Sequence, residues 1–206
     1  MDLLRVEKEL KKRWIFPYKW GRKQNDTWDK NTNFIYKTYT FEALEKQLAN
    51  SEQDLKDYAM NRWYNYWSAK AVEAIFANHK NVIANRNQYD KLVDFTINNI
   101  PFDHKTTVFP KGFKHSFSYA EAHKNELIRW LYQNQSQQGR KHFANRLFIV
   151  LYDENGQHWK LKAAIQNIKT AIDNYMLTFA QENLIKLNFD NKTVYSDIIW
   201  IKSIMH

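Results

Sequence analysis

The sequence predicts an α/β protein in which a mixed central sheet is flanked by helices, and three observations lead to this fold class. Short runs of β-branched and aromatic residues follow a long run with helical spacing. The run RLFIVLYD (146–153) is apolar throughout, as in a strand buried on both faces. From residue 53 the predicted order is α-β-β-β-α-β-α-β, which fits a sheet covered by helices on both faces.

The N-terminal part of the chain, residues 1–52, is predicted to be a helical and irregular extension of an α/β domain at 53–206. Residues 2–14 form a short basic helix in this prediction, and an irregular segment follows it. A second helix begins after Thr40, which can cap it, with Glu42 and Glu45 in its first turns.

The α/β domain is predicted to start with a long helix that contains the aromatic run WYNYW. Ser118 and Glu121 form a capping box at the start of a later helix. Trp63 and Trp67, spaced i and i+4, are expected in the core rather than in a base-stacking patch. The expected helices are 53–79, 118–135 and 157–181, and the expected strands are 81–85, 91–97, 100–109, 146–153 and 192–203.

Composition limits the class of protein further. Of the 206 residues 44% are apolar, enough for a core, while 4 Gly and 3 Pro leave no flexible linker. The absence of Cys excludes disulfides, a thiolate zinc site and a cysteine nucleophile. We find no signal-peptide pattern and no apolar stretch of membrane-spanning length, so we expect a cytoplasmic protein without a membrane partner. The net charge of +9 favours a polyanionic partner, above all nucleic acid.

The stretch KLVDFTINNIPFDHKTTVFP (91–110) reads as a hairpin with acids on one face. Asn98 and Asn99 suit the two-residue turn of a hairpin, because Asn tolerates positive φ. This turn sets three opposed pairs: Ile97 with Ile100, Phe95 with Phe102, and Asp94 with Asp103. The apolar pairs share one face and the two aspartates share the other with Lys105.

Two like charges placed opposite each other in a sheet repel, because their Cβ atoms lie about 4.5–5.5 Å apart. A shared proton or a divalent cation such as Mg²⁺ or Mn²⁺ would relieve this repulsion. Glu73 lies within an apolar stripe of the preceding helix, from which it could reach the same face. The simpler alternative is that Asp94 and Asp103 are solvated acids, with Lys105 bridging Asp103.

A helix Glu followed by a hairpin with Asp in one strand and D-x-K in the next resembles the PD-(D/E)xK nuclease superfamily. The resemblance covers about half of the chain and implies a restriction-endonuclease-like core of order α-β-β-β-α-β. It implies that Asp94 and Asp103 bind the metal, that Lys105 positions the attacking water, and that Glu73 completes the site. The backbone carbonyl of His104 would be a further ligand. Val93 stands where the name-giving Pro often sits.

The activity that this resemblance implies is metal-dependent phosphodiester hydrolysis, with DNA expected rather than RNA. Phosphate contacts are expected from basic residues after the hairpin: Lys111, Lys114, Arg129, Arg140, Lys141 and Arg146. A homodimer is a further expectation, since each strand of a duplex needs an active site. Two alternatives stay open: an inactive nuclease-like module for nucleic-acid binding or assembly, and an unrelated basic α+β binding protein.

Overall fold

The computed structural model describes residues 1–20, 26–87, 90, 92–134, 143–189 and 192–203. The chain divides into two compact units, one of Met1–Val72 with Lys162–Gln166, the other of Glu73–Leu161 with Asn167–His206. The change from one unit to the other falls inside the long helix α4 (Gln53–Ala77). The long helix carries core side chains on both sides of that point, so it belongs to both units.

The first unit is helical. Its elements are α1 (Leu3–Lys11), α2 (Asp26–Asn31), α3 (Phe41–Leu48), the 3₁₀ turns η1 (Lys12–Ile15) and η2 (Asn33–Tyr36), and the greater part of α4 (Gln53–Ala77). The predicted cap is confirmed, since the Thr40 side chain accepts a hydrogen bond from the Ala43 N–H. Trp63 is confirmed as a core residue: it is fully buried and donates its indole N–H to the Thr38 carbonyl at 2.7 Å.

The second unit is built on an open, mixed six-stranded sheet of order β1-β2-β3-β4-β6-β5. Strands β1, β2 and β3 form an antiparallel meander, β3, β4 and β6 run parallel, and β5 pairs antiparallel with β6. The bounds are β1 Val82–Ala84, β2 Phe95–Ile97, β3 Ile100–Val108, β4 Arg146–Tyr152, β5 Ile185–Phe189 and β6 Lys192–Lys202. The structure thus confirms a mixed sheet flanked by helices.

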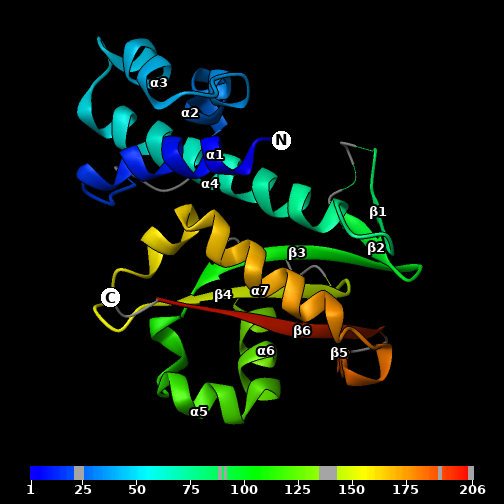
Figure 1. Ribbon diagram of the computed structural model, residues 1–206. Helices are drawn as coiled ribbons and strands as arrows, with labels where there is room; N and C mark the ends of the chain where they lie inside the picture. The colour runs from blue at the N-terminus through cyan, green and yellow to red at the C-terminus, as the bar shows by residue number, and fades with distance from the viewer. Residues whose placement is uncertain (21–25, 88–89, 91, 135–142, 190–191, 204–206) are drawn as a thin grey trace. The chain divides into compact units, whose positions relative to one another are not determined.

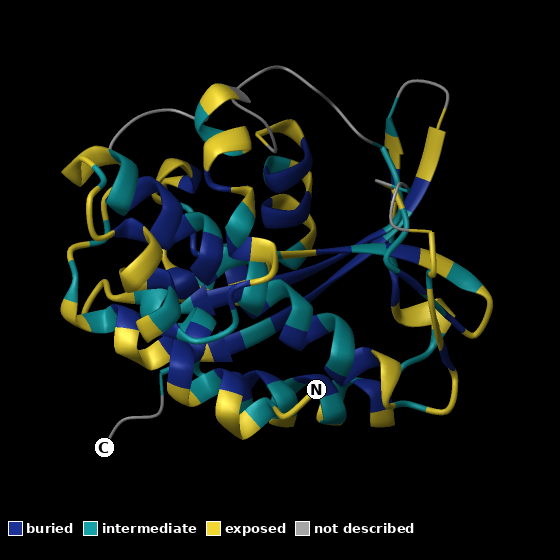
Figure 2. Ribbon diagram, turned by 90° about the horizontal axis from the view of Figure 1, so that it is seen from above, coloured by how far each residue is buried: buried dark blue, intermediate teal, exposed yellow. Residues whose placement is uncertain are grey.

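Helices cover both faces of this sheet (Figure 1). Helices α5 (Phe117–Ala122) and α6 (Lys124–Gln133) pack on one face, where the buried residues of α6 meet Phe148 and Val150 of β4. Helix α7 (Ile165–Leu177) lies on the other side (Figure 1). Strand β4 is buried along its length, as the dark central strands of Figure 2 show, which explains its uninterrupted apolar sequence.

Two predicted helices differ from those of the structure. The helix expected at 118–135 is two helices, because the backbone of His123 leaves the α region at φ −123° and ψ 51°. Its N-cap is Ser116 rather than Ser118, with the Tyr119 N–H donating to the Ser116 hydroxyl at 3.1 Å. The helix expected at 157–181 begins only at Ile165, after the 3₁₀ turn η4 (His158–Ala163).

Strand β5 is absent from the prediction, although its sequence IKLNF alternates apolar and polar residues as a half-buried strand does. It is a five-residue edge strand in which Leu187 is buried, Lys186 and Asn188 are exposed, and Ile185 and Phe189 pack against the core.

None of the described helices is both long enough and apolar enough to cross a membrane.

Candidate functional site

The hairpin that presents the two aspartates has the predicted turn and register. Asn98 and Asn99 adopt φ values of 49° and 66°, as a two-residue hairpin turn requires. Phe95 pairs with Phe102 and Ile97 with Ile100. Strand β2 begins only at Phe95. Before it, the carboxylate of Asp90 accepts hydrogen bonds from the N–H groups of Leu92 and Val93, so these two groups bond to a side chain instead of to a neighbouring strand.

Asp94 lies just before β2, and its carboxylate accepts a backbone hydrogen bond from β3 that the carbonyl of a neighbouring strand would otherwise accept. Its backbone N–H donates to the Phe102 carbonyl at 2.8 Å. Its Oδ2 accepts from the His104 backbone N–H at 2.8 Å and lies 2.8 Å from the His104 Nδ1. The His104 side chain is 5% exposed and the Asp94 side chain 27% exposed. Asp94 is therefore a fixed side chain at the edge of β3, not a solvated surface acid.

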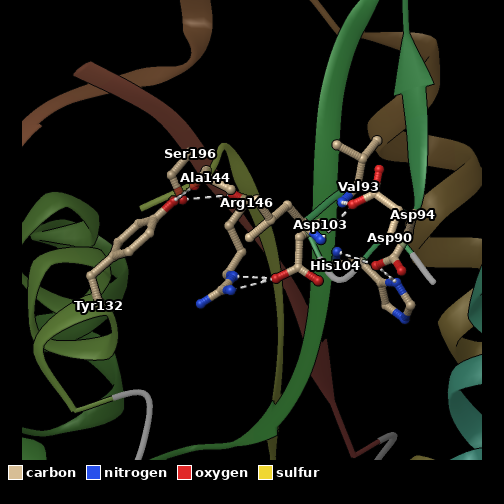
Figure 3. A network of polar contacts seen from close by, with 10 residues as sticks. Asp90, Val93, Asp94, Asp103, His104, Tyr132, Ala144, Arg146 and Ser196 are labelled. Atoms are coloured by element: carbon tan, nitrogen blue, oxygen red, sulfur yellow. Dashed lines mark hydrogen bonds and ion pairs between the residues drawn. The ribbon is translucent and has the colours of Figure 1, made fainter. Parts of the chain in front are cut away.

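Asp103 is held from the other side by Arg146, its register partner at the start of β4 (Figure 3). The Arg146 Nε and Nη2 lie 2.6 and 2.5 Å from the Asp103 Oδ2. The guanidinium carbon lies 5.6 Å from the ring centre of Tyr132 and 5.7 Å from that of Phe148. With side-chain exposures of 7% for Arg146 and 17% for Asp103, this is a largely desolvated ion pair.

The two aspartates interact electrostatically, as the predicted facing pair requires. Burial raises the pKa of Asp103, the Arg146 guanidinium lowers it, and the Asp94 carboxylate raises it again, leaving it above its ordinary value. Burial also raises the pKa of Asp94, but the hydrogen bonds and charge of His104, together with a hydrogen bond from Asp103, lower it below its ordinary value. The pair therefore has unequal affinities for a proton, with Asp103 the member that binds it more tightly.

Backbone geometry brings a third oxygen to the edge of β3 that carries Asp94. The Asp103 N–H donates to the Asn145 carbonyl on the β4 side, so the N–H and carbonyl of His104 point to the opposite, β2 side. The donors available here are oxygens, the type that Mg²⁺ and Mn²⁺ prefer. The hydrogen bonds from His104 and Arg146 use the Oδ2 atom of each aspartate, and Arg146 balances the charge of Asp103, so the set fits a hard cation in the chemistry of its donor atoms.

Lys105 and Glu73 occupy different surroundings. Lys105 is exposed and, by strand alternation, points to the same face of β3 as Asp103. Glu73 is half-buried near the end of α4, and one turn later Phe76 stacks on Phe95 at 4.4 Å, which in turn stacks on His104. This end of α4 thus covers the face opposite to Asp103. Among the residues that the structure describes, no three Asp, Glu or His side chains gather as a metal-binding group, so Glu73 is not brought into one with the aspartates.

The predicted phosphate-contacting residues divide into three sets. Lys111, Lys114 and Arg129 are exposed around the start of α5 and on α6. Arg140 and Lys141 lie outside the described residues. Arg146 is buried, and its guanidinium faces Asp103 instead of solvent, because a charged side chain at the start of a fully buried strand needs a counter-charge.

The sequence interpretation overlooked the two side chains that position the aspartates. His104 was expected to contribute its carbonyl, yet its ring and N–H also bind Asp94. Arg146 carried one usable signal: it opens an otherwise apolar strand, and a buried Arg is paired almost without exception. Its partner depends on the parallel register of β3 and β4, which no local pattern encodes.

Neither a protein-family model nor a curated protein nor a solved structure matches this chain. The function is therefore inferred from the geometry of the site.

Proposed function

We propose that this protein is a divalent-metal-dependent nuclease that hydrolyses phosphodiester bonds in DNA. The observation that carries the proposal is the pair of carboxylates of Asp94 and Asp103 at the edge of β3, each fixed by a neighbouring side chain, with Lys105 on the Asp103 face. The Asp94 charge raises the pKa of Asp103, and a bound cation would remove this repulsion.

The order of elements around this pair supports the same proposal. Helix α4, strands β1 to β3, helices α5 and α6, and strand β4 follow one another as in the α-β-β-β-α-β core of the nucleases that the sequence resembles. We propose that this part of the chain is a restriction-endonuclease-like core, to which β5, β6 and α7 are additions.

In this proposal Asp94, Asp103 and the His104 carbonyl would hold Mg²⁺ or Mn²⁺, which would supply Lewis-acid activation of the phosphate and of the attacking water. His104 and Arg146 act before the metal binds: each fixes one carboxylate and keeps its oxygens oriented. The exposed ammonium of Lys105 is placed to contact a phosphate oxygen or the attacking water. Glu73 is left out of this ligand set, since α4 covers the other face.

The substrate class follows from charge. The chain carries 31 Lys and Arg against 22 Asp and Glu, and exposed cations lie on the α5–α6 side of the sheet. A cationic surface of this kind binds the phosphate backbone with an affinity that falls as salt rises.

A second candidate function is a nuclease-like module that binds nucleic acid without cutting it. The observation that favours it is the Arg146–Asp103 ion pair, which already compensates one of the two carboxylates. In that case the pair is structural, and the described side chains supply no third acid to hold a metal.

Cleavage assays separate the two functions. Purified protein is incubated with circular, linear and single-stranded DNA and with RNA, in Mg²⁺, Mn²⁺ or EDTA. The nuclease proposal expects cleavage in metal alone, its loss in Asp103→Asn and Lys105→Ala, and its retention in Glu154→Gln, which removes an exposed turn carboxylate. Salt-sensitive binding with no cleavage in any metal identifies the binding module. Cleavage that survives in EDTA or in Asp103→Asn refutes the site.

A further inference from the structure

Three aromatic rings form a parallel stack on the outside of α5. The ring of His115 lies 4.3 Å from that of Tyr119 with 15° between their planes, and Tyr119 lies 4.0 Å from His123 with 13° between planes. His115 and His123 are exposed and Tyr119 between them is half-buried. We name these three side chains the ring ladder.

The ladder is held by groups that are not part of it. Ser116 caps α5 at the Tyr119 N–H, and on the opposite side of the helix Phe117 stacks on Tyr152 at 3.9 Å within the core. The Tyr119 hydroxyl donates to Glu126 at 3.1 Å, and the His123 Nδ1 lies 3.0 Å from the Tyr119 carbonyl. Tyr119 also packs against the core cluster, whereas His115 and His123 are exposed on either side of it, so the rings are preorganised at the surface.

One end of the ladder is open. At the His115 end Phe113 covers the stack in a tilted contact at 5.1 Å. At the other end Tyr119 is the ring partner that the described contacts give to His123. A further planar group can therefore stack on the outer face of His123.

Charged side chains of both signs accompany the ladder. Lys114 directly precedes it in the sequence and is exposed, as are Lys111 and Arg129. Of the neighbouring acids, Glu121 pairs with Lys202 at 2.8 Å, and Glu126 accepts a hydrogen bond from the Tyr119 hydroxyl. The combination of an exposed aromatic ring and the exposed ammonium of Lys114 is complementary to a nucleobase attached to a phosphate.

We infer that the ring ladder binds an unpaired base of single-stranded nucleic acid, which stacks on His123, while a phosphate further along the strand contacts Lys114 at the His115 end. The near-parallel rings suit this ligand, since every base has a flat face that stacks on an aromatic ring. The two imidazoles cannot share a metal ion, because the Tyr119 ring lies between them. This inference rests on the proposed function, because that function supplies nucleic acid as the class of ligand. It does not require that the protein cleave the nucleic acid.

Binding in the presence of EDTA tests the inference without cleavage. Fluorescence anisotropy is measured with a labelled oligothymidine and with an abasic strand of the same length at fixed salt. His123→Ala is expected to weaken binding of oligothymidine by roughly 5- to 150-fold, the range for loss of one base–aromatic stack, and to leave abasic binding unchanged. His123→Trp should retain or exceed native affinity, since it restores a stacking surface.

Matched variants distinguish stacking from charge. Lys114→Ala should weaken binding of both strands alike and reduce the salt dependence. Trp20→Ala removes another exposed aromatic, which contacts Tyr58 edge-on, and should change neither affinity. Unchanged oligothymidine affinity in His123→Ala, or an equal loss for the abasic strand, overturns the inference even if Asp103→Asn abolishes cleavage. Base-dependent loss in a protein that never cleaves supports the ladder and refutes the nuclease.

Discussion

Replacing Arg146 with Met tests whether the Arg146–Asp103 pair holds the site together. Both side chains are less than a fifth exposed, so removing the guanidinium leaves a desolvated carboxylate next to a second one, Asp94. Breaking a buried ion pair from one side costs about 3–5 kcal/mol. At roughly 2–4 °C per kcal/mol for a chain of this size, the melting temperature should fall by roughly 6–20 °C. Thermal melts followed by circular dichroism, with urea unfolding as a second measure, give this quantity.

The loss should depend on pH, and its sign follows from the pKa of Asp103. That pKa lies above its ordinary value in the native protein, and without the guanidinium it rises further. A carboxyl whose folded pKa is raised contributes stability below its unfolded pKa and loses it as pH rises through the folded pKa. The deficit of Arg146→Met should therefore be smallest in acid and largest at neutral pH.

A double-mutant cycle decides the cause. In the Asp103→Asn background the carboxylate charge is gone, so Arg146→Met should cost little or be stabilising. The reasoning is refuted if Arg146→Met lowers stability equally in both backgrounds and at all pH values. Packing of the guanidinium on Tyr132 and Phe148 would then be its main contribution.

The remaining predictions concern the turn, the core and the cap. Asn99→Gly should preserve or raise the free energy of unfolding, whereas Asn99→Ala should lower it by about 1–2 kcal/mol, because Asn99 has φ 66°; urea titration of both variants measures the difference, and equal stabilities would contradict it. Phe102→Ala should cost about 3–5 kcal/mol, because the ring is fully buried; a loss under 1 kcal/mol in the same titration would contradict this. Ser116→Ala should cost about 1 kcal/mol through loss of the cap on the Tyr119 N–H; unchanged stability in the same titration would contradict this.

Local patterns were sufficient for the hairpin. Asn98 and Asn99 tolerate positive φ, and a two-residue turn sets every pair that follows, so the opposition of Phe95 to Phe102 could be read from the sequence. The same holds for the uninterrupted apolar run of β4, which marks a strand covered on both faces. The alternation of IKLNF in β5 is a local signal of the same kind that the prediction overlooked, whereas the break at His123 has no such signal.

The register of the hairpin follows from the sequence, because side-chain alternation and turn length are properties of neighbouring residues. The surroundings of Asp94 and Asp103 depend on tertiary packing. The parallel register of β3 and β4 places Arg146 beside Asp103. The pairing of β2 with β3 stops at Phe95 and Phe102, and beyond it the His104 N–H donates to the Asp94 carboxylate. The packing of α4 through Phe76 sets Glu73 on the other face. Such contacts join residues far apart in the chain, and their choice depends on how whole elements pack, which no local spacing encodes.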